Sequence, residues 1–295
     1  MQTKVRYPPI LNVGYFKAVG SCHGIICVLI QHYVVFWNPS FGKFKISRIL
    51  LDFVRNYGFG YDHLSDNYKV VAAYFYDGES DSTDSDDDEE EEEEEVFKKT
   101  KVVVHTLGTN CWRRIKMFPC ASGVPVGESS GTFVSGAINW VTSKDGSEFN
   151  SLFFVVSLNL ANESYQEIFQ PDYGDLNVVC LTLGVLRDCL CIFAHGELFI
   201  DVWIMKEYGK EESWSKLFTI PFANAEDLGL YPCNKATYIY EDEQVLLVSR
   251  AKYISKPKLV VYDSKRDTFK LLNIKNIEKR MVPTVYVESL ITTCS

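Results

Sequence analysis

Three aspartates come nearest to a catalytic pattern in this sequence. Asp62, Asp201 and Asp263 stand near the ends of predicted strands, and two carboxylates brought together could serve as the acid and the base or nucleophile of a glycoside hydrolase. Aspartate is also common in surface turns, and nothing in the spacing brings two of the three together. We therefore expect no catalytic residues, with a glycosidase as a lesser alternative.

The nine cysteines and five histidines form no metal-ligand pattern. There is no C-x-x-C pair, so neither a bound metal nor another cofactor is expected. Cys22, Cys27 and Cys191 fall in apolar runs, where a cysteine acts as a small buried hydrophobe and a thiolate is disfavoured. The cysteines are therefore predicted to be reduced and structural, in a protein of the cytoplasm or nucleus.

Motifs that bind nucleotides or metals in enzymes are also missing. The sequence has no H-E-x-x-H, no G-x-x-x-x-G-K-[ST] and no G-x-G-x-x-G. The G-F-G run at 58–60 lies in a predicted strand and lacks the third glycine and the following helix. These motifs therefore give no support to an enzymatic function.

An acidic segment dominates the charge. Residues 77–95 hold 14 of the 39 acidic residues, and without them 30 basic residues stand against 25 acidic ones, a net charge of +5. Such a run repels itself and has no apolar surface to bury, so we expect a disordered loop between two strands. A solvated spacer is its simplest role, and electrostatic capture of a basic partner is the alternative.

Neither nucleic acid nor a membrane is expected as a partner. Lys98-Lys99-Thr100-Lys101 and Arg113-Arg114 lie on adjoining predicted strands, but no recognition helix or RNP-like order accompanies them. The same lysines neighbour the glutamate run and could pair with it. No stretch of eighteen apolar residues and no signal-peptide core occurs.

Short apolar segments that end at turn residues predict β-strands throughout the chain. A strand, a polar turn and a second strand that begins with an aromatic recur five times. The aromatics are spaced 68, 53, 49 and 55 residues apart, and the first interval contains the 19-residue acidic segment; they are Phe44, Trp112, Tyr165, Trp214 and Phe269. A period near 50 residues is typical of kelch-like propellers.

A second hairpin precedes each repeat and supplies the other half of a blade. The fold predicted is therefore all-β, a kelch-like β-propeller of five to six four-stranded antiparallel blades over residues 20–295, after an N-terminal extension of residues 1–19. The segment Cys22–Ile30 supplies only one clear strand, and Thr284–Glu288 could complete that blade and close the ring. Packing between blades is the role predicted for Trp112, Trp140 and Trp214.

Seven segments stand out as motifs: GSCHGIIC (20–27), WNPSFGKF (37–44), YGFGYDHLSDNYKVV (57–71), HTLGTNCWR (105–113), GAINW (136–140), DVWIMKEYG (201–209) and YVESL (286–290). In this order they resemble the plant F-box-associated domain of F-box/kelch-repeat and S-locus F-box proteins. The resemblance implies a substrate-recognition module that recruits a target protein to an SCF-type ubiquitin ligase. In such ligases a separate F-box helical bundle binds a Skp1-like adaptor.

No F-box of that kind precedes Gly20, so adaptor binding is expected only if an F-box is supplied outside this chain. Two explanations stay open: a truncated sequence, or a free-standing interaction propeller that binds targets without delivering ubiquitin. The residues that bind the target are unknown. The candidate contacts at one mouth of the ring are residues 77–95 and the turns near His63, Lys144 to Glu148 and Gly209 to Glu212.

Overall fold

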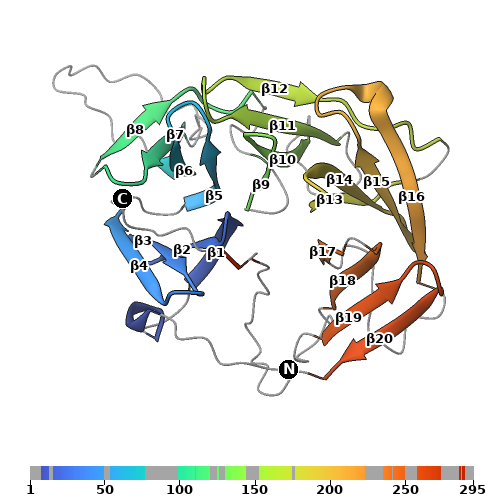
Figure 1. The fold of residues 1–295 in the computed structure, drawn as a ribbon. Helices are drawn as coiled ribbons and strands as arrows, with labels where there is room; N and C mark the ends of the chain where they lie inside the picture. The colour runs from blue at the N-terminus through green and yellow to red at the C-terminus, as the bar shows by residue number, and fades with distance from the viewer. Residues whose placement is uncertain are drawn as a thin grey trace, which may run out of the picture.

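The computed structural model contains five four-stranded antiparallel sheets arranged around a central axis (Figure 1). It describes residues 8–12, 16–49, 54–76, 99–109, 111–119, 125, 130–143, 153–174, 177–222, 235–240, 242–249, 258–273, 286 and 288–289. The predicted loop at 77–95 therefore lies outside the described residues. The prediction of a β-propeller is confirmed, and its blades number five in the part of the chain described.

Each blade is built from consecutive strands that pair in chain order. Blades one and two contain β1 (Phe16–Cys22), β2 (Ile25–Ile30), β3 (Tyr33–Asn38), β4 (Lys43–Arg48), β5 (Val54–Asp62), β6 (Asn67–Tyr76), β7 (Lys99–Thr106) and β8 (Trp112–Ile115). Blade three contains β9 (Thr132–Val134), β10 (Ala137–Ser143), β11 (Phe153–Asn159) and β12 (Tyr165–Ile168).

Blades four and five complete the set: β13 (Cys180–Leu186), β14 (Cys189–His195), β15 (Phe199–Met205), β16 (Trp214–Pro221), β17 (Lys235–Ile239), β18 (Gln244–Ser249), β19 (Lys258–Asp263) and β20 (Thr268–Leu272). Two short 3-10 helices, η1 (Pro9–Asn12) and η2 (Glu211–Ser213), accompany the strands. The first strand of every blade faces the axis and the fourth forms the rim (Figure 1).

The hydrophobic core lies between neighbouring blades. Strands β2 and β10 are buried along their whole length, because their residues face the next blade on one side and the previous blade on the other. Trp140 packs against Phe118 and donates its indole N–H to the Tyr57 carbonyl of blade two at 3.2 Å. Its predicted role between blades is therefore confirmed.

The recurring aromatics of the fourth strands form the same hydrogen bond at three successive junctions. In each case the indole N–H or the tyrosine hydroxyl is the donor. The acceptor is a backbone carbonyl at the end of the last strand of the preceding blade, or just after that end. The bonds are Trp112 to Arg48 at 3.1 Å, Tyr165 to Lys116 at 2.9 Å and Trp214 to Phe169 at 2.8 Å. The sequence period thus reflects a repeated contact between blades.

Two glycines let blades two and three approach closely. A Cβ atom at Gly58 would lie 2.9 Å from the Trp140 ring, and one at Gly131 would lie 2.4 Å from the same ring. The Gly131 amide also donates to the Tyr57 carbonyl at 2.8 Å. The G-F-G run is therefore a packing motif, since bare backbone is what this junction requires.

Blade one differs from the prediction. It has four strands of its own, because β1 starts at Phe16 and contributes the strand that the sequence left unassigned. The prediction that Thr284–Glu288 completes this blade is wrong, since Tyr286 and Glu288 are not in a strand. The segment nevertheless contacts the blade: Tyr286 packs on its apolar face, and Asn38 donates to the Ser289 carbonyl at 3.0 Å.

The described cysteines follow the prediction with one exception. Cys22, Cys27, Cys111, Cys189 and Cys191 are free thiols, and burial raises the pKa of Cys22 and of Cys191 to about 12. Cys180 is instead disulfide-bonded, and its partner lies outside the described residues. The prediction of reduced cysteines is wrong at this position.

Candidate functional site

Antiparallel pairing sorts the connections of every blade onto two opposite faces of the ring. One face, called here the His23 face, carries the turns between first and second strands and between third and fourth strands. The other, the Leu198 face, carries the connections between second and third strands. A parallel bridge between Tyr57 and Ser130 shows that the chain runs in one direction along the axis in blades two and three, as in neighbouring blades of a propeller.

Turns from four blades meet on the His23 face. His23, in the β1–β2 turn, packs edge-on against Tyr61 with ring centroids 4.9 Å apart, and Tyr61 packs in the same way against His63. The His23 Nδ1 lies 3.3 Å from the Tyr68 hydroxyl. Gly136, in the β9–β10 turn, faces the His63 ring, and the charge of Asp188, in the β13–β14 turn, reaches His23.

We call His23, Tyr61, His63, Leu64, Asp66, Tyr68 and Asp188 the His23 cluster. Leu64 is 83% exposed, the largest exposure among the large apolar side chains of the described residues. His23, His63, Asp66 and Asp188 are also exposed, while Tyr68 is buried and supports the rings from below. Tyr61 donates its hydroxyl to a carboxylate oxygen of Asp66. The cluster therefore combines aromatic rings, carboxylates and an exposed aliphatic side chain.

The buried carboxylate of Asp62 fixes the turn that displays this cluster. It accepts hydrogen bonds from the Leu64 amide at 2.9 Å and the Ser65 hydroxyl at 2.6 Å, and it pairs with Lys69 at 2.9 Å. Burial opposes ionisation, but these bonds outweigh it and lower the pKa of Asp62 to about 2. The carboxylate is thus ionised at neutral pH and holds the turn.

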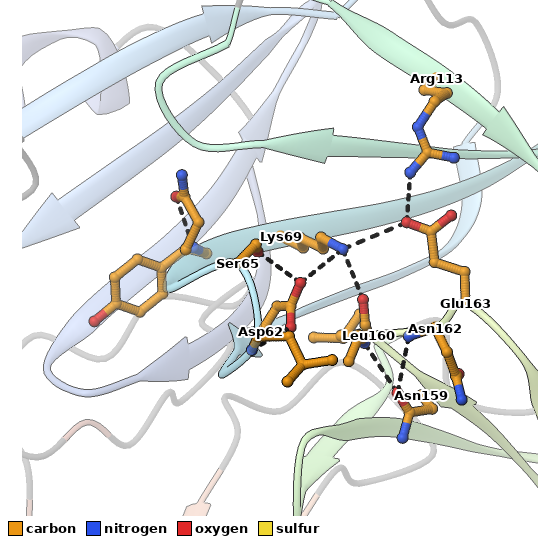
Figure 2. A network of polar contacts seen from close by, with 12 residues as sticks. Asp62, Ser65, Lys69, Arg113, Asn159, Leu160, Asn162 and Glu163 are labelled. Atoms are coloured by element: carbon orange, nitrogen blue, oxygen red, sulfur yellow. Dashed lines mark hydrogen bonds and ion pairs between the residues drawn. The ribbon is translucent and has the colours of Figure 1, made fainter.

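The same network ties blade two to blade three (Figure 2). The Lys69 ammonium, enclosed between the blades, donates to the Leu160 carbonyl at 2.7 Å and lies 3.4 Å from Glu163. Glu163 in turn pairs with Arg113 of β8 at 2.5 Å. The turn bearing His63 and Leu64 is therefore anchored to a neighbouring blade and presented on a rigid support.

The structure separates the three aspartates that could have formed a catalytic pair. Asp201 lies inside β15, where it accepts from Thr219 at 2.5 Å and pairs with Lys216 at 2.7 Å. Asp263 ends β19, where it shapes the following turn and pairs with Arg266 at 2.7 Å. With Asp62 they occupy three different blades, each beside its own cation, so they form no acid–base pair.

One enzyme-like pattern was missed in the sequence. Residues 127–131 spell G-E-S-S-G, which fits the G-x-S-x-G pattern of serine hydrolases. That pattern requires a helix after the serine, whereas Gly131 leads directly into β9 and Ser130 donates to the Val19 carbonyl of blade one at 2.6 Å. Ser129 lies outside the described residues. The order of elements does not fit a nucleophile elbow.

The predicted contact loops do not share one mouth of the ring. His63 and Gly209 to Glu212 lie in turns of the His23 face. Residues 77–95 and Lys144 to Glu148 lie outside the described residues, but the strand ends that they join, β6 with β7 and β10 with β11, meet at the Leu198 face. The prediction of one mouth is therefore wrong, because antiparallel strands alternate between the two faces.

The basic residues considered for nucleic acid are partly engaged within the protein. Arg113 is paired with Glu163, while Arg114 is exposed on the opposite side of β8. Lys101 lies towards the far end of β7, which pairs with β8 through Val102 to His105. Lys98 is outside the described residues. Arg113 and Arg114 therefore lie on opposite sides of β8, and Arg113 is committed to an ion pair within the protein.

The described residues hold no group of three or more His, Cys, Asp or Glu side chains arranged to bind a metal. Likewise, among them no helix has the length and apolar character needed to cross a membrane. The fold defines a kelch-like β-propeller domain, and among the residues that the structure describes its His23 face carries a cluster of aromatic and charged side chains.

Comparison with known proteins assigns the family. Residues 4–293 match the F-box associated beta propeller domain, and this chain belongs to that family. It is 30% identical over 223 residues to the F-box/kelch-repeat protein At3g23880 of Arabidopsis thaliana, covering 72% of this chain and 55% of the relative. The family match begins before Phe16, so it includes much of the segment 1–19.

Two further Arabidopsis thaliana relatives agree. The F-box protein At3g07870 is 29% identical and is matched over 70% of this chain and 51% of its own length. The F-box protein CPR1 is 27% identical and is matched over 81% and 56%. The chain thus spans about half the length of these curated relatives. The family resemblance drawn from seven sequence motifs is confirmed.

Proposed function

We propose that this chain is the substrate-recognition module of an SCF-type ubiquitin ligase and that it acts in the cytoplasm or nucleus without catalysing a reaction itself. The observation that carries the proposal is the family match over residues 4–293, together with relatives that are all named F-box proteins. A rigid ring that holds exposed turns in fixed positions suits the recognition of a protein surface.

The chemistry of the described residues supports a binding role. The three candidate aspartates are separated and paired. The buried thiols of Cys22 and Cys191 have a raised pKa and are poor nucleophiles at neutral pH. Ubiquitin transfer would therefore depend on other subunits, recruited through an F-box and a Skp1-like adaptor.

The test compares the chain as it stands with the same chain joined to an N-terminal F-box. Both forms are expected to capture the same target protein from a plant extract, and only the F-box form is expected to retain the adaptor and to promote ubiquitination of that target. Capture without ubiquitination by the F-box form would favour a free-standing interaction propeller. Failure of both forms to capture a protein selectively would contradict the proposal.

A further inference from the structure

The His23 cluster has the chemistry of a cation-binding surface. Its exposed carboxylates, Asp66 and Asp188, come from different blades. The rings of His23, Tyr61 and His63, joined by edge-to-face contacts of 4.9 Å, lie beside Asp66, which accepts the Tyr61 hydroxyl. Aromatic faces attract ammonium and guanidinium groups, and nearby carboxylates strengthen that attraction.

Local charges favour the same sign of ligand. The potential cation Lys69 is enclosed between blades and committed to Asp62 and the Leu160 carbonyl, so it does not offset the exposed carboxylates. Arg187, the neighbour of Asp188 in the same turn, is an exposed cation, and Asp188 is the anion whose charge raises the pKa of His23. Partial desolvation of the His23 ring, followed by the neighbouring His63, lowers the pKa of His23, and the charge of Asp188 opposes this shift.

An apolar anchor lies beside the charged groups. Leu64 stands in the same turn as Asp66 and is 83% exposed, and the bonds to Asp62 hold this turn in place. A partner segment with an apolar residue could bury the Leu64 side chain and so remove its apolar surface from water. An acidic partner would instead meet the Asp66 and Asp188 carboxylates.

We propose that the His23 cluster binds a lysine or arginine side chain of the target protein, in a segment whose neighbouring apolar residue packs on Leu64. This inference rests on the proposed recognition function and assigns it to one face and to one class of segment. The carboxylates supply the charge, the rings supply a cation-binding face, and Leu64 supplies the apolar contact. The Leu198 face then takes no part in binding this side chain.

The experiment measures binding of fluorescein-labelled decapeptides to the full chain by anisotropy at 150 mM salt. One peptide alternates lysine with leucine, one alternates glutamate with leucine, and one alternates lysine with serine. The key variant is Asp66→Asn with Asp188→Asn, since asparagine tolerates the left-handed backbone of both positions, with φ of 50° and 58°. The control is Asp172→Asn with Glu197→Gln, which removes the same charge from exposed residues outside the turns of the His23 face.

The lysine–leucine peptide is expected to bind the unaltered chain, to bind the Asp66/Asp188 variant at least tenfold more weakly, and to bind the control within twofold. Leu64→Ser is expected to weaken the lysine–leucine peptide several-fold and to leave the lysine–serine peptide unchanged. Since the acidic segment 77–95 is present in every form, the differences report on the cluster alone.

Three results would overturn the inference: no binding of the lysine–leucine peptide, equal binding by the Asp66/Asp188 variant and the unaltered chain, or equal binding of the glutamate–leucine peptide. The target captured in the ligase experiment separates this inference from the proposed function. If that target still binds the Asp66/Asp188 variant with full affinity, the recognition function stands and the assignment to this cluster fails.

Discussion

At the scale of single residues, Lys69 is the cation on which the His63 turn depends. Replacing it in Lys69→Met leaves Asp62 buried and unpaired, which we expect to cost about 3 to 5 kcal/mol in the free energy of unfolding. Arg113→Ala removes the other cation of the network, but that side chain is exposed, so the expected cost is about 1 kcal/mol or less. Urea unfolding of both variants checks this, and equal losses would contradict it.

His195 gives the protein a titration that can be measured. Its ring is fully buried, its Nε2 lies 3.0 Å from the Thr182 hydroxyl, and burial lowers its pKa to about 3. The unfolded chain binds a proton near pH 6.5 and the folded chain does not, so stability is complete above pH 6.5 and falls as the pH drops towards 3.

The slope from this one residue is expected to approach 1.4 kcal/mol per pH unit, an order-of-magnitude value, between pH 6 and 4. His195→Gln removes the titrating group, so the stability of this variant should fall less steeply over the same range. Urea unfolding at several pH values gives both slopes. Identical slopes would mean that His195 takes up a proton in the folded state.

At the scale of elements, the aromatic that opens a fourth strand joins its blade to the one before. Tyr165→Phe keeps the ring and removes the bond to the Lys116 carbonyl, so we expect a loss of about 0.5 to 1.5 kcal/mol. Trp214→Phe should lose more, because it removes ring area as well as the bond to Phe169. Tyr33→Phe, at an exposed tyrosine, is the control and should change little. Urea unfolding midpoints measure these losses. Equal midpoints for Tyr165→Phe, Trp214→Phe and Tyr33→Phe would show that the aromatic contacts between blades do not stabilise the fold.

Most strands could be predicted because short apolar segments alternate with clusters of turn residues along the chain, and the pattern repeats about every 50 residues. Strand β1 was missed because its seven residues, FKAVGSC, mix glycine, lysine and serine, and only Val19 and Cys22 are buried. The His23 cluster could not be predicted either. His23, His63 and Asp188 come together only when blades one, two and four curve around one axis, and no local pattern encodes that curvature.

Asp62 illustrates the same limit. Its place at a strand end was evident in the sequence, but its role depends on Lys69 and, through it, on the Leu160 carbonyl of another blade. The strand ends that flank residues 77–95 and 144–148 lie at the face opposite His63, and counting the strand reversals within each blade predicts this placement.

At the scale of the whole molecule, two distant motifs meet. Asn38 of the WNPS motif accepts from the Ser40 amide at 2.8 Å and donates to the carbonyl of Ser289 in the YVESL motif at 3.0 Å. Asn159 holds the equivalent turn of blade three, accepting from Ala161 at 2.9 Å.

Asn38→Ala should therefore destabilise the protein more than Asn159→Ala, by about 1 kcal/mol or more, because it also breaks the bond between blade one and the C-terminal segment at Ser289. Thermal or urea unfolding measures the difference. Equal losses would indicate that the contact with Ser289 adds nothing to stability.

The account as a whole claims that this propeller recognises its target through the His23 face. Hydrogen–deuterium exchange of the chain, alone and with the captured target protein, tests that claim most directly. We predict slower exchange in the complex at residues 23–24, 61–66 and 187–188, and unchanged exchange at 196–198. Slower exchange confined to 196–198 and the other connections of the Leu198 face would contradict it.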